Sequence, residues 1–221
     1  MNILEEKLLS AEKVALTGHV SPDGDCIGSL LSLYNYISTV YPKIKISAYL
    51  EEFNDKFLFL KNSENIKHSV EEDSEFDLLI CVDSADMERL GFAKELLKRS
   101  KESINIDHHV SNPEYGDIAC VIAYSSSTSE IIYNFIKYME YKFSLSVAEA
   151  LYLGLVNDTG NFSHSNVKVG TMQMATDLIA MGVNNNYIVT NFLNSNSYQT
   201  LKMMGEALKN FKFYPEKKLS Y

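Results

Sequence analysis

Four short, largely apolar runs in this chain each end in acidic or histidine side chains. The runs cover residues 14–17, 78–82, 104–106 and 151–156. Carboxylates and imidazoles are costly beside buried apolar segments unless something pairs with them. A pair of divalent cations would supply that pairing and would also support chemistry at the same place. The residues that follow the four runs are His19, Asp23 and Asp25, then Asp83, then Asp107, His108 and His109, and finally Asp158.

Short apolar segments alternate with helical ones along the chain. Such alternation is typical of a parallel sheet that is covered by helices on both faces. We therefore predict an α/β, Rossmann-like fold with a mostly parallel, five-stranded sheet, flanking helices and a helix-rich second half. The expected strands cover residues 13–17, 44–50, 77–82, 103–106 and 119–123.

His19, Asp83 and Asp107 each lie at or just after the end of an expected strand. In open sheets of this kind, ligands bind beyond the carboxyl ends of the strands. The three segments are far apart in the sequence, but the fold would bring them to one edge of the sheet. We therefore expect one shared site at this edge.

The chain has 221 residues and a net charge of −9, which argues against a broad nucleic-acid-binding face. Bound divalent ions would still make a pocket locally positive toward a short anionic substrate. The charged first residues are unlike a signal peptide, and no apolar stretch is long enough to span a bilayer. Cys26, Cys81 and Cys120 have no metal-type spacing and are expected to be buried thiols. We expect a cytoplasmic protein that does not bind membranes.

The first cluster places His19, Asp23 and Asp25 on a turn with Pro22 and Gly24. A turn lets several side chains face one point, which a regular strand or helix does less well. Carboxylate oxygens suit Mg²⁺ and Mn²⁺, and an added imidazole shifts the preference toward Mn²⁺ or a later metal. The alternative interpretation is an acidic helix N-cap beside a solvent-exposed histidine.

Asp107, His108 and His109 are harder to explain as ordinary turn residues. Adjacent side chains of an extended chain point to opposite sides, so one histidine would bind metal while the other faces a substrate. Asp83 and Asp158 each allow a structural alternative. Asp83 could cap the next segment, and Asp158 could belong to a turn that ends a helix.

Arg89 and Ser127 are weaker candidates for contacts to a substrate. Arg89 could reach a phosphate, or it could form a surface ion pair with Asp86 or Glu88. Ser127 precedes an expected helix whose N-terminal amides could receive an anion. Its spacing from Glu130 is that of a capping box, so plain capping is the alternative.

Together these residues resemble a known family. The segments GHVSPDGDCIGS, CVDSADMERLG, NIDHHVSN and GLVNDTGNFSH are similar to the four motifs of the DHH phosphoesterase superfamily and occur in the same order, over about residues 14–165. Within the superfamily they resemble the nanoRNase (oligoribonuclease) and pAp-phosphatase branch.

The resemblance implies two divalent ions, with Mn²⁺ favoured over Mg²⁺ or Co²⁺, and with Asp83 as the ligand that both ions share. Asp107 would orient its neighbours, and His109 would contact the scissile phosphate. The other implied ligands are His19 and Asp23 for one ion, and Asp25, His108 and Asp158 for the other.

The implied function is a metal-dependent phosphoesterase, an exoribonuclease or phosphatase. It would hydrolyse short oligoribonucleotides, linear dinucleotides or 3′-phosphoadenosine 5′-phosphate through a hydroxide that the two ions share. Two alternatives stay open: an inorganic pyrophosphatase of related architecture, and a catalytically weak nucleotide-binding regulatory module. Long nucleic acids are not expected as partners, and a homodimer is one possible assembly.

The expected phosphoesterase domain covers residues 1–184, and a helical linker or tail follows at residues 185–221. The resemblance implies a second domain, because members of this branch look two-domain. Their C-terminal, DHH-associated domain carries a GGGH motif. The last glycine here is Gly205, and the sequence contains no such motif. The second domain is therefore expected to be absent.

Overall fold

The computed structural model describes residues 3–139, 141–193, 197–214 and 219–220. Its main sheet consists of β1 (Lys13–Thr17), β2 (Lys45–Tyr49), β3 (Ile66–Lys67), β4 (Phe76–Val82), β5 (Ser100–Asp107) and β6 (Ile118–Val121). All neighbouring strands are parallel, in the order β3-β2-β1-β4-β5-β6. The order reverses between β1 and β4, as in doubly wound folds. The predicted α/β, Rossmann-like fold is confirmed.

The number of strands is a correction, because the sheet has six strands instead of the predicted five. The additional strand, β3, has only two residues. So short a segment shows neither the apolar run nor the alternation by which a strand is identified in a sequence. By contrast, β4 is buried over almost its whole length, and its continuous apolar run made it easy to predict.

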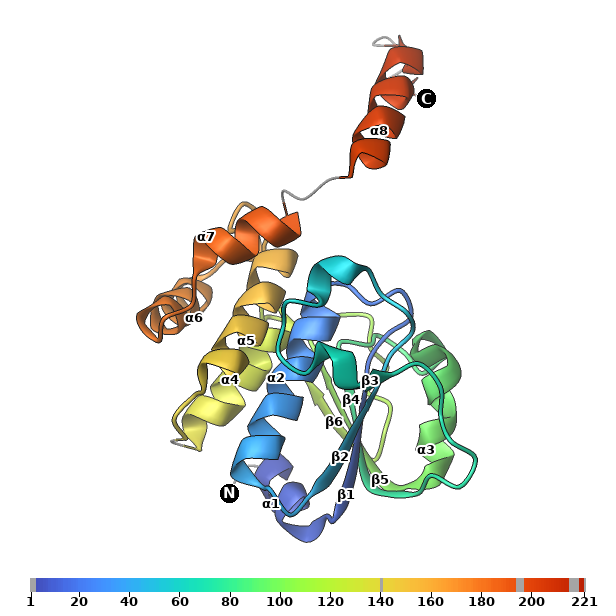
Figure 1. Ribbon diagram of the computed structural model, residues 1–221, viewed down its shortest axis with the longest axis vertical. Helices are drawn as coiled ribbons and strands as arrows, with labels where there is room; N and C mark the ends of the chain where they lie inside the picture. Colours follow the sequence, from blue (N-terminus) through green and yellow to red (C-terminus); the bar gives the residue numbers. More distant parts are fainter. Residues whose placement is uncertain (1–2, 140, 194–196, 215–218, 221) are drawn as a thin grey trace.

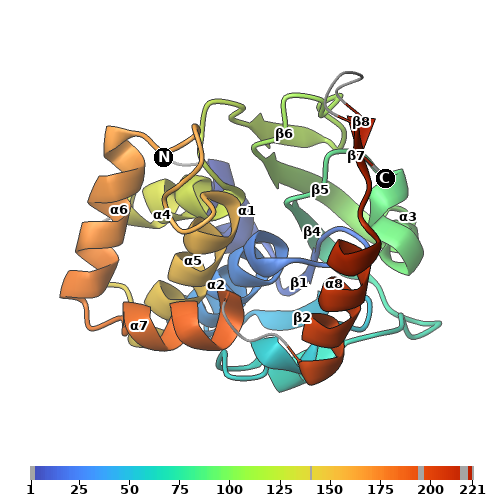
Figure 2. The same ribbon diagram turned by 90° about the horizontal axis from the view of Figure 1, so that it is seen from above.

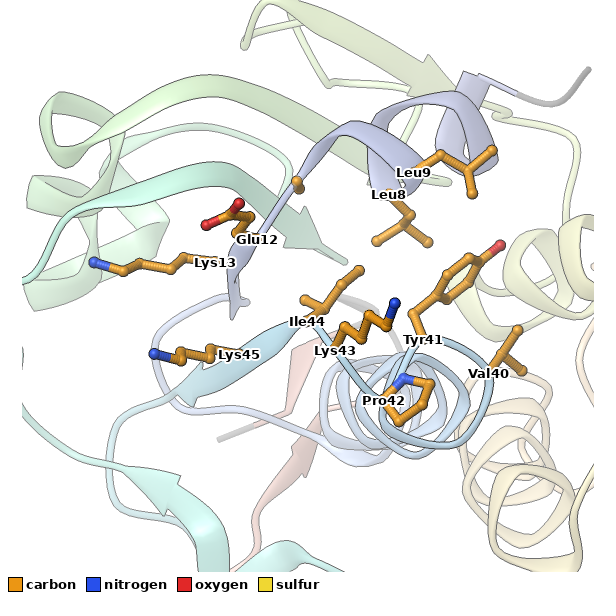
Figure 3. Close-up of a pocket in the computed structure, with 11 residues that line it drawn as sticks. Leu8, Leu9, Glu12, Lys13, Val40, Tyr41, Pro42, Lys43, Ile44 and Lys45 are labelled. Carbon is orange, nitrogen blue, oxygen red and sulfur yellow. The ribbon is translucent and has the colours of Figure 1, made fainter.

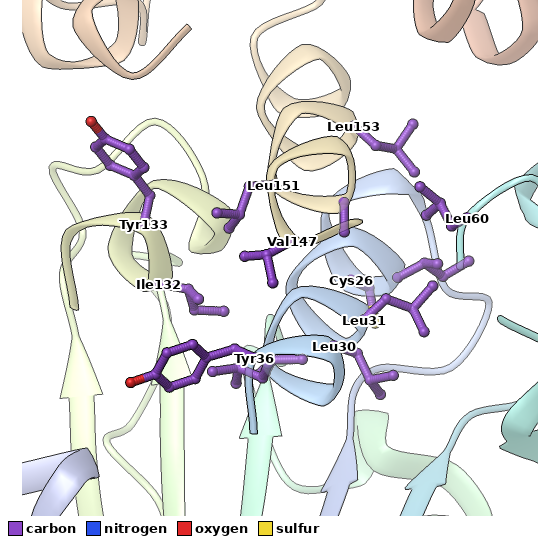
Figure 4. Close-up of a cluster of buried hydrophobic side chains, with 14 of the residues drawn as sticks. Cys26, Leu30, Leu31, Tyr36, Leu60, Ile132, Tyr133, Val147, Leu151 and Leu153 are labelled. Atoms are coloured by element: carbon purple, nitrogen blue, oxygen red, sulfur yellow. The ribbon is translucent and has the colours of Figure 1, made fainter. Parts of the chain in front are cut away.

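Helices cover both faces of the sheet, as Figures 1 and 2 show. Cys26, Leu31, Ile132 and Leu151 belong to the larger core on one face, where three helices meet (Figure 4). A smaller core on the other face contains Leu96. The helical segments are α1 (Ile3–Ser10), α2 (Gly24–Val40), η1 (Asp55–Phe57), η2 (Ser63–Asn65), η3 (Glu88–Glu95), α3 (Leu96–Arg99), α4 (Thr128–Tyr138), α5 (Leu145–Asp158) and α6 (Val169–Ala180).

Helices α2 and α5 cross closely because glycines lie at their contact. A Cβ atom on Gly28 would lie 2.4 Å from the carbonyl oxygen of Ala150. A Cβ atom on Gly154 would lie 2.0 Å from Ser129 Oγ and 2.5 Å from Asp25 Oδ1. Only glycine permits these approaches without a shift of the backbone. The crossing fixes the end of α5, and therefore Asp158, relative to the start of α2.

The start of α5 is a second correction. Ser146 and Glu149 have capping-box spacing, which predicts a helix that begins at Ser146. In the structure, the helix begins at Leu145, and Ser144 is its N-cap, with its side chain accepting a bond from the amide of Val147. Two serines two residues apart offer the same hydroxyl, so spacing alone did not choose between them.

The C-terminal segments differ in how much they contact the main body. Ile188 and Phe192 are buried against it, whereas the last long helix has no buried residue and stands away from the sheet in Figure 1. No helix in the described part of the chain is long and apolar enough to cross a membrane. These segments are α7 (Asn185–Ile188), η4 (Val189–Leu193), α8 (Tyr198–Asn210), β7 (Phe213–Tyr214) and β8 (Leu219–Ser220).

Candidate metal centre

Asp83 lies at the centre of a cluster of carboxylates and imidazoles at the carboxyl edge of the sheet. Its Oδ2 atom is 3.6 Å from Nε2 of His19, and its Oδ1 atom is 3.6 Å from Nε2 of His108. The two carboxylate oxygens therefore face two different imidazoles. The predicted convergence of the first three clusters at this edge is confirmed.

The backbone at Asp83 is in the left-handed region, with φ of 53°. Aspartate tolerates this region better than most residues, but it is still an uncommon conformation. The structure holds it with two contacts: the Asp83 amide donates to the carbonyl of Ile106 at 3.0 Å, and the Thr128 hydroxyl donates to Asp83 Oδ1 at 3.0 Å. Asp83 is not an N-cap, since η3 begins after Met87. The capping alternative for Asp83 is wrong.

His108 and His109 approach the same carboxylate. His109 Nδ1 lies 3.8 Å from the Asp83 oxygen that also faces His108, and the two rings are 4.7 Å apart. The expectation that adjacent histidines point to opposite sides is wrong, because the strand ends at Asp107 and alternation ends with it. His108 Nε2 also lies 2.9 Å from Asp158 Oδ2, which brings the fourth cluster to the same place.

Asp107 is fully buried and holds His109. Its Oδ1 atom is 2.7 Å from His109 Nδ1, and its Oδ2 atom accepts a bond from Asn112 at 2.6 Å. Burial disfavours the charged carboxylate, but these two bonds outweigh burial and lower the pKa of Asp107. Bonding to Asp107 raises the pKa of His109. Asn112 was not predicted, although it is the last residue of the segment NIDHHVSN.

Asp25 is fully buried at the N-terminus of α4. Its two oxygens accept bonds from the amides of Thr128 at 2.6 Å and Ser129 at 3.0 Å, and the Ser29 hydroxyl donates to Oδ1 at 3.3 Å. One interpretation was that the amides of this helix receive an anion, and the anion they receive is the protein's own Asp25 carboxylate. Burial raises the pKa of Asp25 well above its usual range, and the nearby carboxylate of Asp83 adds to the effect.

Asp23 has a structural role as well as a place in the cluster. Its Oδ1 atom accepts bonds from the amides of Asp25 and Cys26, so Asp23 is the N-cap of α2. The same oxygen is 3.8 Å from His19 Nε2. The acidic N-cap of the alternative interpretation is confirmed, but its solvent-exposed histidine is wrong, because His19 is only 6% exposed.

The surroundings of His19 direct its Nε2 atom toward the cluster. Its Nδ1 atom is 2.8 Å from the carbonyl of Val20 and 3.2 Å from Arg89 Nη2. We assign the Nδ1 proton to the bond with Val20, because a carbonyl can only accept. A bound cation would then take the Nε2 position in place of the second proton of the ring. In the described part of the chain, Arg89 makes no ion pair with Asp86 or Glu88, so the surface ion-pair alternative for Arg89 is wrong.

Ser127 is buried and caps α4, with its hydroxyl accepting a bond from the amide of Glu130 at 3.1 Å. The Glu130 carboxylate accepts from the Ser126 amide at 2.8 Å, one residue earlier than a capping box requires. The capping alternative for Ser127 is confirmed. Its hydroxyl is engaged inside the protein, so we do not retain Ser127 as a substrate contact.

Negative charge gathers at this edge without a lysine or arginine ion pair among the described residues. Burial disfavours the charged form of His19 and His108, but the neighbouring carboxylates outweigh it and raise the pKa of each to about 10. Burial also raises the pKa of Asp83. Such a site favours bound positive charge.

The donor atoms are close enough for cations. Asp25, His108 and Asp158 each offer one ligand atom within 4.8 Å of the others. The same is true of His19, Cys26 and Asp83, but burial raises the pKa of the Cys26 thiol well above its usual range and keeps the thiol neutral. The described carboxylates and imidazoles are therefore positioned for metal binding. Of the three predicted buried thiols, Cys26 and Cys81 are confirmed, while Cys120 is partly exposed.

Two cavities lie on different sides of the fold. One, of about 540 Å³, lies between α1 and the start of β2, near Tyr41 and Ile44 (Figure 3). It is at the amino edge of the sheet and contains none of the clustered carboxylates. A smaller cavity of about 270 Å³ lies beside Asp23, at the carboxyl edge.

The structure is that of a Rossmann-like α/β protein with acidic and histidine groups positioned for metal binding beyond the strand ends. The sequence model of the DHH family, N-terminal domain, matches residues 13–155. This chain belongs to the DHH family.

Several relatives carry a common description. The bifunctional oligoribonuclease and PAP phosphatase NrnA of Thermus thermophilus is 28% identical over 222 residues, which cover 97% of this chain and 64% of that protein. The Bacillus subtilis protein of the same description is 31% identical over 173 residues, covering 76% of this chain and 53% of that protein. An exopolyphosphatase-related protein from Bacteroides fragilis has a TM-score of 0.87 at 26% identity, covering 96% of this chain and 65% of that structure. The chain thus spans about half to two thirds of the length of these relatives.

Proposed function

We propose that this chain hydrolyses phosphate esters with a pair of divalent ions at the carboxyl edge of its sheet. The observation that carries the proposal is the position of Asp83. Its two oxygens lie at equal distances, 3.6 Å, from the imidazoles of His19 and His108. A carboxylate between two imidazoles, with further carboxylates beyond each, is a suitable shared ligand for two cations.

The ligands divide into two groups around Asp83. When bound, the two ions would provide a water that loses its proton near neutral pH and positive charge against the phosphate oxygens. The chain's own part is to keep these side chains in place, through the N-cap bonds of Asp23 and the helix amides that hold Asp25. We assign His19 and Asp23 to one ion, and Asp25, His108 and Asp158 to the other.

We assign His109 to the substrate. It is the most exposed imidazole of the cluster, with 40% of its side chain accessible, and Asp107 holds its Nδ1 atom. A proton on Nδ1 is shared with the Asp107 carboxylate, and Nε2 is left to donate to a phosphate oxygen. Asp107 favours the protonated ring, in agreement with the raised pKa of His109. Asp107 would thereby orient His109. Arg89 is exposed and lies beside His19, and we assign it to the same phosphate.

For the substrate, we propose short oligoribonucleotides, linear dinucleotides or 3′-phosphoadenosine 5′-phosphate. The names of the Thermus and Bacillus relatives support this class. A net charge of −9 disfavours long nucleic acids, whose binding depends on many cationic contacts. We propose Mn²⁺ as the metal, since imidazole nitrogens join carboxylate oxygens in the donor set. We also propose a cytoplasmic location.

The test is hydrolysis by the purified chain with Mn²⁺ and with EDTA. We expect Mn²⁺-dependent release of mononucleotide from a diribonucleotide, or of phosphate from 3′-phosphoadenosine 5′-phosphate. Release of phosphate from inorganic pyrophosphate alone would replace the proposal with a pyrophosphatase. Nucleotide binding without any Mn²⁺-stimulated turnover would replace it with a regulatory module.

A further inference from the structure

A cavity of about 270 Å³ opens beside the first acidic cluster. It brings together four segments that are distant in the sequence, including η1 and the segment η4. One of its lining residues, Asp23, belongs to the cation site, and another, Asn157, donates to Asp158 Oδ1 at 2.9 Å. The cavity is therefore next to both groups of proposed ligands. Its lining residues are Pro22, Asp23, Gly24, Asn54, Lys56, Phe57, Asn157 and Phe192.

Lys56 is the only cationic residue that lines this cavity. Its Nζ atom lies 4.3 Å from the ring centre of Phe192 and 5.1 Å from that of Phe57. Attraction between the ammonium group and the two ring faces restricts where this long side chain can lie. The position of the charge is thus set before any ligand arrives, which lowers the entropic cost of binding.

The ammonium group of Lys56 has donors to spare. Among the described residues, no carboxylate lies within ion-pair distance of it and no hydrogen bond engages it. An ammonium group has three N–H donors, and here they are left for water or a ligand. Other described lysines are engaged in ion pairs, such as Lys101 with Asp77 at 2.8 Å. In the described part of the chain, Lys56 is distinguished by holding an unpaired ammonium group over two aromatic rings at the wall of a cavity.

The two rings hold the lysine and are not available for stacking on a base. Phe57 is 3% exposed and Phe192 is 4% exposed. A cavity of this size is also below the range of about 300–1,000 Å³ in which whole drug-sized ligands are usually bound. The cavity suits a single compact anionic group. A phosphate group is of that size and charge, and it accepts several hydrogen bonds.

We infer that Lys56 binds a second phosphate of the substrate, next to the one that is hydrolysed. The inference rests on the proposed function, because it takes the clustered carboxylates and imidazoles as the place of cleavage. In a nucleoside bisphosphate this group is the phosphate that remains on the product. In a short oligonucleotide it is the neighbouring phosphodiester. Lys56 would thus favour substrates with two phosphates over simple monoesters.

The test compares two nucleotides that differ by one phosphate. 3′-phosphoadenosine 5′-phosphate and adenosine 3′-monophosphate share the same scissile ester. Lys56→Gln should raise KM for the bisphosphate by about 10- to 100-fold, the loss typical of a hydrogen bond to a charged group. It should leave kcat for the bisphosphate, and both constants for the monophosphate, within about twofold of wild type. Lys56→Arg should restore most of the loss, because arginine keeps both the charge and the ring contact.

Lys61→Gln is the matched control. Lys61 is exposed, lies five residues further along the same segment and does not line the cavity, so the same loss of charge should leave both substrates unaffected. An equal rise of KM for both nucleotides in Lys56→Gln, or the same rise in Lys61→Gln, would overturn the inference. So would an unchanged KM in Lys56→Gln.

A binding measurement keeps this result separate from the proposed function. Calorimetric titration of the same two nucleotides in Ca²⁺ needs no turnover. If the wild-type chain hydrolyses neither nucleotide, the proposed function fails. The inference about Lys56 then stands if Lys56→Gln weakens binding of the bisphosphate alone. It falls if wild type and Lys56→Gln bind the bisphosphate equally, or if wild type binds neither nucleotide.

Discussion

Asp77 at the amino edge of the sheet differs from Asp25 and Asp83 at the carboxyl edge in the direction of its pKa shift. At the amino edge, Asp77 accepts bonds from the amides of Glu12 and Lys13, each at 2.9 Å, and pairs with Lys101 at 2.8 Å. These partners lower the pKa of Asp77 to about 2. At the carboxyl edge, Asp25 and Asp83 have raised pKa values because they are buried among other carboxylates.

This difference in pKa distinguishes a carboxylate with a structural role, Asp77, from one with a proposed role in metal binding, Asp83. Every carboxylate oxygen of Asp77 has a donor within the protein, so nothing else is needed to offset its charge. Asp83 has a hydroxyl donor and three neighbouring imidazoles, and it has no lysine or arginine partner among the described residues. A buried carboxylate in such a place is costly unless a cation joins it. At the amino edge, protein groups alone offset the charge of Asp77. At the carboxyl edge, metal ions would offset the charge of Asp83.

Asp83→Asn is expected to have the largest effect of the variants that test this difference between the two edges. Asparagine also tolerates the left-handed backbone, so the variant should fold. It loses the charge that the two ions share, and we expect kcat/KM on a diribonucleotide to fall by at least about 10⁴-fold. Circular dichroism of the ion-free variant checks the fold. Asp77→Asn, the same change at the opposite edge, is the control and should retain activity within about twofold. Similar activity losses in both variants would remove the distinction between the edges.

His109→Ala separates two roles within the carboxyl edge. His109 is assigned to the substrate and His108 to a metal ion. We expect His109→Ala to lose about 10²- to 10³-fold in kcat, as for removal of one group that stabilises the transition state. Its Mn²⁺ content should equal that of wild type, whereas His108→Ala should lose metal. Equal metal loss in both variants would show that the two histidines are wrongly assigned.

Asn112→Ala tests whether the hydrogen bond from Asn112 to Asp107 helps to hold His109 in place. Asn112 donates to Asp107 at 2.6 Å and to Asn105 at 2.7 Å, and Asp107 holds His109. Loss of such a supporting contact at a metal site typically costs about 10- to 100-fold in activity. Steady-state kinetics on the diribonucleotide measures the effect. Asn134→Ala, on the exposed side of α4, is the matched control and should match wild type. An unchanged rate in Asn112→Ala would show that His109 needs no such support.

The smallest expected effect is on stability at the amino edge. Asp77→Asn should lower the free energy of unfolding by about 1 kcal/mol at pH 7, because it weakens three bonds to one carboxylate. The folded-state pKa of Asp77 is about 2, below its unfolded value of 3.8. The stabilisation is therefore fully present above about pH 4 and is lost as the pH falls toward 2.

Urea unfolding of wild type and Asp77→Asn at pH 7 and at pH 2.5 checks this sign. The difference between the two proteins should shrink at the lower pH. Asp73→Asn, an exposed loop residue without a described partner, should show no difference at either pH. A gap that widens on acidification would contradict the role given to Asp77.

The elements that could be predicted are those with a strong local signal. β1 and β4 have apolar runs that a doubly covered sheet requires, and their observed bounds agree with the prediction to within one residue. β3 could not be predicted, because two residues are too few to show an apolar run or an alternation of apolar and polar side chains. Convergence of the clusters followed from one rule, that strands of a parallel sheet end at one edge.

The rest of the site depends on loops and on contacts across the chain. The prediction that His108 and His109 point to opposite sides was wrong because β5 ends at Asp107, before both histidines. The bond from Thr128 to Asp83 joins residues 45 positions apart, and no spacing in the sequence indicates it. Lys56 lies in a one-turn segment whose neighbour in space, Phe192, is far away in the chain. Such pairs become visible only when the fold is known.

We propose that the carboxyl edge holds two cations through one shared carboxylate, that of Asp83. Isothermal titration of Mn²⁺ into the ion-free protein tests it most directly, with wild type and Asp83→Asn measured side by side. We predict two bound equivalents for wild type, and no site of wild-type affinity in Asp83→Asn. A wild-type stoichiometry below two, or two equivalents of unchanged affinity in Asp83→Asn, would contradict the claim.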